Sequence, residues 1–211
     1  MSNHTRVVFP GAARTWAYHC VRNAAARKGL RVWLKTSHTP FLRTSREVTL
    51  KTARVTVEGI TATPQAIHIL DALGKTGKAP VRNAIRLIVS HEAAHRSQGE
   101  NSLKRRYIPS NLLEARANRE MIADLLQRCG VGSVTEVLKE GRARKKFIDH
   151  ASDFFAVMHA LTPPAFRHTG AASMHVRFLP YVPARLEEDV KKAAASKLAQ
   201  YGIKTSERRG N

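Results

Sequence analysis

Apolar residues recur at helical spacing along most of the chain, which predicts a mainly helical protein. The segments with this spacing start near capping residues or prolines and stop near glycines or prolines. They are residues 12–28, 63–73, 80–98, 111–128, 141–161 and 183–202. We expect Gly74 to end the second of these helices, Gly99 the third, and Cys129-Gly130-Val131-Gly132 the fourth. A short helix is also expected after Ser133, with Glu136 completing a capping box.

Alternation of polar and apolar residues predicts strands, mainly in the first third of the chain. Residues 31–35 and 47–57 alternate in this way, and residues 5–9 are a shorter candidate. Because these segments precede the helix that begins near Pro80, we expect a small antiparallel sheet preceding that helix. A further short strand is expected at residues 175–179. The predicted fold class is α+β and mainly helical.

The length and composition suit one globular domain. The chain has 211 residues, of which 43% are hydrophobic and 25% charged, enough for a sizeable core. We expect a single domain over residues 1–202 and a mobile tail over 203–211. Within the domain, residues 1–62 would form the sheet and a basic helix, 63–128 two motif-bearing helices, and 133–202 a C-terminal helical part.

The N-terminus has no apolar signal-peptide core, and no apolar run approaches the length needed to span a membrane. We therefore expect a protein that is not secreted, has no membrane partner, and acts in the cytoplasm or inside a virus particle. Only two cysteines are present, Cys20 and Cys129, which indicates neither a disulfide framework nor a thiolate zinc site. They are expected to be small buried residues.

The strongest chemical pattern is His91-Glu92-Ala93-Ala94-His95 in the helix that begins near Pro80. Two histidines four residues apart on a helix project to the same face and can share one zinc ion. The apolar residues before the motif lie within about 60° of His91, so the histidine face continues the buried face. Glu92 stands beside this face as a candidate general base. The alternative is a half-buried helix that merely carries two histidines.

A catalytic zinc needs a third protein ligand, and Glu114 is the natural candidate. No histidine lies between His95 and His150, whereas Glu114 opens a mostly apolar helix face. That face also carries Ala117, Asn118, Met121 and Leu125. Asn118 lies one turn after Glu114 and could steady a ligand by a hydrogen bond. Glu120 and Asp124 lie off this face, and we expect them to be solvated or paired with nearby arginines.

These residues resemble the ImmA/IrrE-type zinc metallopeptidases, which have a second motif of Glu-x-x-Ala-Asn ahead of a Leu-Leu pair. Here that motif is matched by Glu114, Ala117 and Asn118, with Leu125-Leu126 following. The likeness covers about the central third of the chain, and a more distant zincin with a glutamate third ligand also fits. It implies a zincin-like domain, a Zn²⁺ cofactor and a protein or peptide substrate, typically a DNA-binding regulator.

Several other residues are candidates for supporting roles near the zinc. Tyr107 lies in the connection between the motif helices and could donate a hydrogen bond to an oxyanion, although packing is the alternative. His150, with Asp149 or Asp153 nearby in sequence, could act in acid–base chemistry or support a ligand. The alternative for His150 is a structural histidine.

The formal net charge is +20, from 36 Lys and Arg against 16 Asp and Glu, which predicts DNA or RNA as a partner through non-specific charge. Basic clusters occur at Lys104, Arg105 and Arg106 and at Arg142, Arg144, Lys145 and Lys146. An alternative function is therefore a basic nucleic-acid-associated or virion structural protein that keeps a zincin-like fold. The sequence does not indicate an oligomeric state.

Overall fold

The computed structural model describes residues 10–51, 53–97, 110–166 and 181–203. Its helices are α1 (Pro10–Ala13), α2 (Trp16–Ala26), α3 (Pro64–Thr76), α4 (Lys78–Ser97), α6 (Ser110–Cys129), α7 (Val134–Lys139), α8 (Gly141–Leu161) and α9 (Ala184–Gln200). Its strands are β1 (Arg31–Leu34), β2 (Leu42–Lys51) and β3 (Ala53–Ala62), and a 3-10 turn spans Pro164–Phe166. The fold is α+β and mainly helical, with one small sheet before α4, as the sequence predicts.

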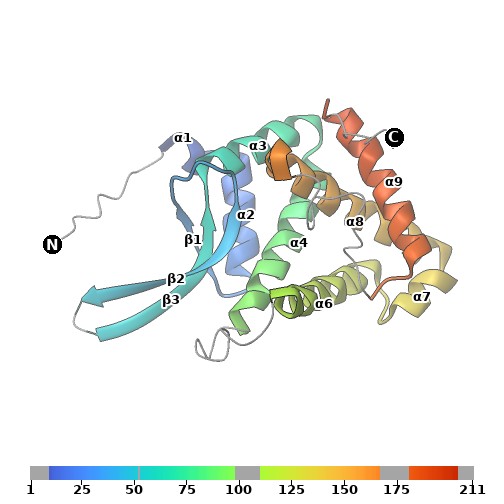
Figure 1. Cartoon of the computed structure of the whole chain (residues 1–211), viewed down its shortest axis with the longest axis horizontal. Coiled ribbons are helices and arrows are strands. Elements are labelled where there is room, and N and C mark those ends of the chain that lie inside the picture. The colour runs from blue at the N-terminus through green and yellow to red at the C-terminus, as the bar shows by residue number, and fades with distance from the viewer. Residues whose placement is uncertain (1–9, 52, 98–109, 167–180, 204–211) are drawn as a thin grey trace.

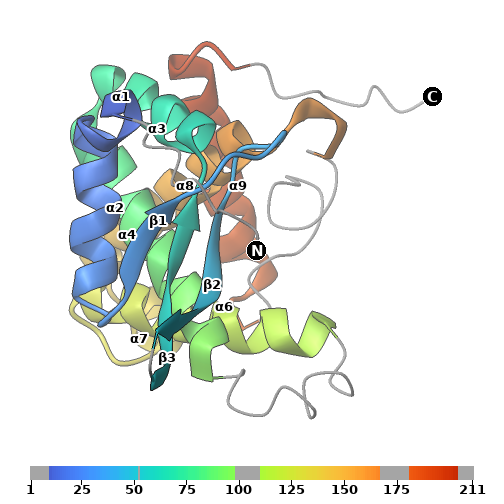
Figure 2. The same cartoon turned by 90° about the vertical axis from the view of Figure 1, so that its left-hand side faces the viewer.

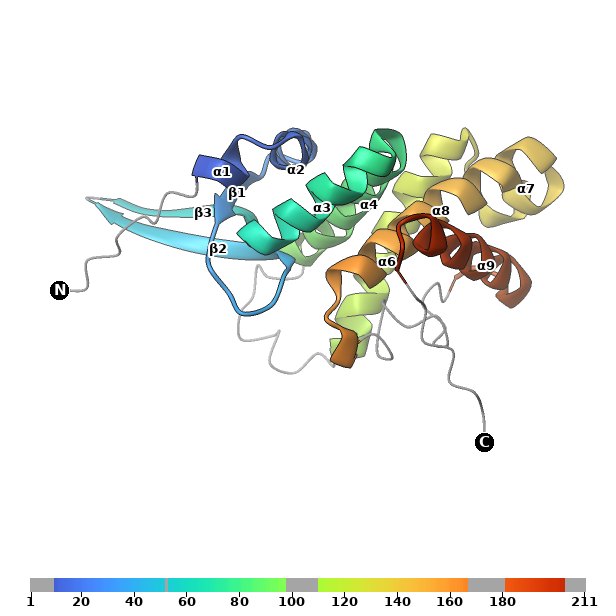
Figure 3. The same cartoon turned by 90° about the horizontal axis from the view of Figure 1, so that it is seen from above.

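Helix α4 occupies the middle of the fold. It contacts α2, α3, α6, α8 and the strands β2 and β3. Figures 1 and 3 show the sheet at one end of the molecule and α7, α8 and α9 at the other, with α4 between them. Residues of α4 are therefore positioned from several directions at once.

The core explains why α4 is held so firmly. Ile85 and Leu87 are 0% and 1% exposed, and α8 contributes Phe147 and Phe155 at 0% and 1%. Burying one such side chain contributes about 1.5–3 kcal/mol.

In the described part of the chain, no helix combines the length and apolar character that crossing a membrane requires.

The sheet is mixed, which corrects the expectation of an antiparallel one. Strands β2 and β3 pair antiparallel, and the single strand expected at residues 47–57 is in fact parts of both. β1 pairs parallel with the other edge of β3, with Arg31 opposite Gly59. Both arms of a hairpin alternate with the same period, so alternation cannot locate a chain reversal that lacks Gly, Asn or Pro. Figure 2 shows the three strands side by side.

Gly59 permits the parallel pairing. A Cβ atom at this position would lie 2.4 Å from the carbonyl oxygen of Arg31 and 2.3 Å from the Trp33 ring. Only a residue without a side chain allows such a close approach of backbone and ring. The order of strands in the sheet is therefore β1-β3-β2, with β1 and β2 at its edges.

The helix expected at residues 12–28 is divided into α1 and α2. Thr15 lies between them and caps α2, since its hydroxyl accepts a hydrogen bond from the Tyr18 N–H at 3.2 Å. The same hydroxyl donates to the Ala12 carbonyl at 2.8 Å. By bonding to the Ala12 carbonyl and the Tyr18 N–H, the Thr15 side chain interrupts the helical backbone hydrogen bonds at this point. The apolar spacing does not register this interruption and therefore predicts one long helix.

Other expected ends lie where the sequence places them. The Ser133 hydroxyl accepts from the Glu136 N–H at 3.2 Å and caps α7. Gly130 has a φ of +81° and ends α6. The strands expected at residues 5–9 and 175–179 lie outside the described residues, as do Gly99 and residues 204–211 of the expected tail.

Gly74 does not end a helix, contrary to expectation. It lies inside α3, which continues to Thr76, and Gly77 is the C-cap. A Cβ atom at Gly74 would lie 2.5 Å from the ring of Trp16. This glycine therefore admits the indole ring between α2 and α3, and its role comes from packing.

We expect Gly74→Ala to lower the free energy of unfolding by about 1–3 kcal/mol, because the new methyl group must displace the Trp16 ring. In an open helix position the same change would be stabilising. Gly141→Ala is the matched control, since its Cβ would meet nothing within 4 Å. Urea denaturation of both variants gives the comparison. Equal stability of the two variants would contradict the packing role of Gly74.

Candidate metal centre

The predicted metal-binding residues come from two crossing helices. His91 and His95 lie one turn apart near the C-terminal end of α4, and Glu114 lies near the start of α6. Figure 1 shows α6 crossing this end of α4. The crossing brings Glu114 to the two histidines, as the sequence predicts.

The three side chains converge through their polar atoms. The Nε2 atoms of His91 and His95 are 3.3 Å apart. One carboxylate oxygen of Glu114 lies 3.2 Å from His91 Nε2, and the other lies 3.5 Å from His95 Nε2. Among the histidine, cysteine and acidic side chains of the described residues, these three lie close enough together to hold one metal ion.

These distances match the edges of a zinc coordination tetrahedron. With metal–ligand bonds of about 2.0–2.1 Å, two ligand atoms of a tetrahedral zinc are about 3.3–3.4 Å apart. The observed separations of 3.3, 3.2 and 3.5 Å fit this value without rearrangement. Two imidazoles and one carboxylate also form a ligand set that suits zinc and leaves a fourth position for water. The residues therefore fit a catalytic type of zinc site.

The centre is buried on the α4 side and open on the α6 side. The side chains of His91 and His95 are each 12% exposed, whereas that of Glu114 is 55% exposed. The hydrogen bond with His91 lowers the pKa of Glu114, and the charges of His91 and His95 lower it further, while partial burial raises it. Glu114 is thus ionised at neutral pH, in the form that binds a cation.

Glu92 is half-buried and lies next to His91 on α4. Adjacent helix positions differ by about 100°, so Glu92 stands to one side of the histidine face. A general base must be beside the metal ligands without being one of them, and this position meets that requirement. The Nε2 atom of His91 faces the candidate centre, and the other ring nitrogen, Nδ1, is buried and has no hydrogen-bond partner among the described residues.

A second contact between α4 and α6 was not foreseen. The buried hydroxyl of Ser90, which precedes His91, donates to Asp124 at 3.1 Å. Arg128 donates to the same carboxylate oxygen at 3.0 and 2.9 Å. The expected pairing of Asp124 with an arginine is confirmed, and Glu120 is exposed as expected. The Ser90–Asp124–Arg128 cluster holds α6 against α4 beside the metal-binding residues.

The inward face of α6 is also as predicted. Ala117 and Met121 are 0% and 1% exposed, and Asn118 is 5% exposed. The small Ala117 side chain permits close approach of the helices. Asn118 is therefore buried one turn from Glu114, where it could steady the ligand.

His150, a candidate for a supporting role, lies beside Asn83 of α4, away from the candidate metal centre. Nδ1 of His150 lies 3.1 Å from the amide nitrogen of Asn83, and Asn83 also donates to Asp153 at 3.3 Å. Asn83 precedes His91 by eight residues, a rise of about 12 Å along α4. Burial lowers the pKa of His150, which fits a packed neutral histidine. Tyr107 lies outside the described residues.

The candidate nucleic-acid-binding residues have mixed positions. Arg142 and Lys145 are exposed on α8, and Lys146 is half-buried. Arg144 donates to Asp189 of α9 at 2.7 Å, so it helps to hold the two helices together. Lys104, Arg105 and Arg106 lie outside the described residues.

Comparison of this chain with protein-family models, with curated proteins and with solved structures finds no match. The likeness to ImmA/IrrE-type peptidases thus has no support beyond the motif residues themselves.

We expect Glu114→Ala to weaken zinc binding by at least about 100-fold, because even residues that only support a ligand contribute about 10–100-fold. Glu120→Ala is the matched control, since it removes one carboxylate from an exposed position of the same helix. Competition with a chromophoric zinc chelator gives both affinities. If the two variants bind zinc equally, Glu114 is not a ligand.

Proposed function

We propose that this protein is a zinc-dependent metallopeptidase. The observation that carries the proposal is the convergence of His91, His95 and Glu114, with ligand atoms 3.2–3.5 Å apart, beside Glu92. A structural zinc site usually has four protein ligands, whereas three ligands and an adjacent carboxylate are typical of hydrolytic sites. The open side of the centre at Glu114 gives a substrate a way in.

The residues have distinct roles in this proposal. His91, His95 and Glu114 would hold zinc, which as a Lewis acid lowers the pKa of water and polarises a carbonyl group. Glu92 takes the proton from the attacking water and then gives it to the leaving amine. Because Glu92 is half-buried, its carboxylate is partly shielded from bulk solvent. Fewer water molecules then solvate the carboxylate, which favours its taking the proton from the attacking water.

The sheet supports a peptide as the substrate. Strand β2 is at the edge of the sheet and also contacts α4. An edge strand has unpaired backbone groups that an extended peptide can satisfy by adding a further strand. The peptide would then run beside the helix that carries His91 and His95. This arrangement favours an extended segment of a protein substrate over a compact small molecule.

We expect Glu92→Gln to retain about one zinc per chain while its rate of peptide hydrolysis falls by roughly 10²–10⁴-fold, since glutamine cannot accept the proton. His95→Ala should lose the zinc as well as the activity. Metal content is measured by elemental analysis, and hydrolysis with a mixture of fluorogenic peptides and unfolded protein. A Glu92→Gln variant as active as the parent protein would contradict the assigned base.

A second function, binding of nucleic acid, is favoured by the net charge of +20. Arg142 and Lys145 are exposed on α8 and available to phosphates. In this alternative the metal centre stabilises the crossing of α4 and α6 and performs no reaction. Nucleic-acid binding is also compatible with peptidase activity, if the basic surface brings the enzyme to a regulator on DNA.

If this second function is correct, binding to a DNA duplex should show little sequence preference and should weaken steeply with salt. A protein that makes six to ten phosphate contacts loses roughly 10³–10⁵-fold in affinity between 50 and 200 mM salt. Fluorescence anisotropy with two unrelated duplexes measures both properties. Affinity that does not change with salt, or no binding at low salt, would exclude this function.

A further inference from the structure

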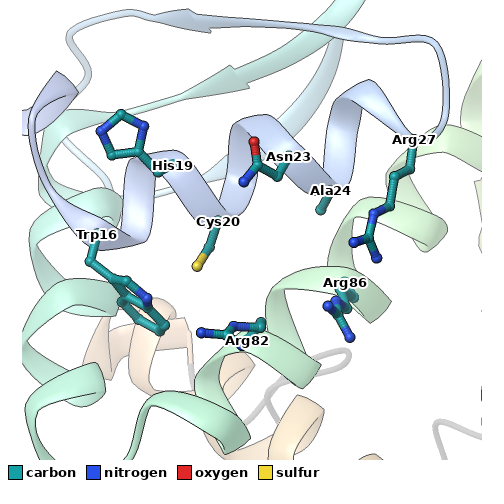
Figure 4. A pocket seen from close by; sticks show the side chains of 8 residues that line it. All are labelled: Trp16, His19, Cys20, Asn23, Ala24, Arg27, Arg82 and Arg86. Atoms are coloured by element: carbon teal, nitrogen blue, oxygen red, sulfur yellow. The ribbon is translucent and has the colours of Figure 1, made fainter.

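A pocket of about 290 Å³ lies between α2 and α4, away from the metal centre. Its lining includes Trp16, Cys20 and Asn23 of α2, the C-cap residue Arg27 that follows α2, and Arg82 and Arg86 of α4. Figure 4 shows these side chains around the space between the two helices. Arg86 and His91 are five residues apart on α4, which corresponds to about 140° around the helix. The pocket and the metal centre therefore use different faces of the same helix.

Three arginine side chains line this pocket. Figure 4 shows Arg27 extending from α2 toward Arg86 on α4, with Arg82 one turn before Arg86. Arg82 also lies beside Cys20, whose sulfur it can hydrogen-bond, and its guanidinium carbon is 5.9 Å from the centre of the Trp16 ring. Both of these contacts of Arg82 lie on the Trp16 side of the pocket.

Among the residues that the structure describes, no acidic side chain pairs with the charge of these arginines. Asp71 of α3, an acidic residue near Cys20, accepts a hydrogen bond from the Ala17 N–H in the first turn of α2 at 3.3 Å. Burial lowers the pKa of Arg86, and the positive charges of Arg128, Arg27 and Arg82 lower it further. An anion in the pocket would relieve this repulsion.

We propose that the pocket binds a phosphate group carried by a nucleotide or by a nucleic-acid strand. The guanidinium group is planar, stays charged and pairs with two phosphate oxygens at once, which suits it to this ligand. A volume of about 290 Å³ is at the small end of ligand pockets, so a phosphate with its sugar fits better than a large cofactor. The exposed amide of Asn23 at the rim is available to a sugar hydroxyl.

The experiment is a calorimetric titration of the full chain with pyrophosphate, with adenosine monophosphate and with a short single-stranded oligonucleotide. Arg27→Gln and Arg86→Gln should each weaken binding by about tenfold or more, because each removes charge-assisted hydrogen bonds. The matched control is Arg22→Gln, an exposed residue of α2 that does not line the pocket. This control should change the affinity by less than about threefold, since a distant exposed charge is screened by solvent.

The probes separate the sources of the phosphate. Binding of the monophosphate that depends on Arg27 and Arg86 supports a free nucleotide as the ligand. Binding of the oligonucleotide alone, with the same dependence, supports a phosphate of a nucleic-acid strand. Equal losses in Arg22→Gln, Arg27→Gln and Arg86→Gln would overturn the proposal in favour of diffuse surface charge, and so would an absence of binding to all three probes. Thermal unfolding of each variant checks that the fold is kept.

Discussion

The burial of α4 is the interaction on which the rest of the structure depends. This helix contacts α2, α3, α6, α8 and two strands, and Ile85 and Leu87 of its central turns are almost completely buried. A helix held on so many sides cannot rotate or slide, because each apolar side chain is fitted into a close-packed environment. Its polar residues therefore have fixed directions. His91 and His95 face α6, and Arg82 and Arg86 face α2.

The candidate metal centre depends on the position of α6 as much as on that of α4. A carboxylate one turn out of place on α6 would be about 5 Å away, too far to complete a zinc site. The Ser90–Asp124–Arg128 cluster supplies a polar contact between the two helices next to His91, and Ala117 permits their close approach. Polar pairing and small-residue packing together set the distance at which Glu114 meets the histidines.

The basic residues separate into groups with different roles. Arg144 pairs with Asp189 and connects α8 to α9, whereas Arg128 pairs with Asp124 one turn earlier on the same helix, α6. Arg27, Arg82 and Arg86 surround a pocket, and among the described residues they have no such carboxylate partner. Burial lowers the pKa of Arg86 and the positive charge of Arg128 lowers it further, so Arg128 lies near the arginines of this pocket.

The sequence by itself determined the features that depend on local spacing. Three features follow from helix geometry, and the described residues bear out their placement. They are the histidines at positions i and i+4, the apolar face that begins at Glu114, and the capping residues Ser133 and Gly130. Tertiary structure decided what local spacing leaves open: the hairpin within residues 47–57, the Trp16 ring over Gly74, and the meeting of Arg27 with Arg86. In each case the partner lies on another strand or helix, and periodicity along one segment contains no information about which segment packs against it.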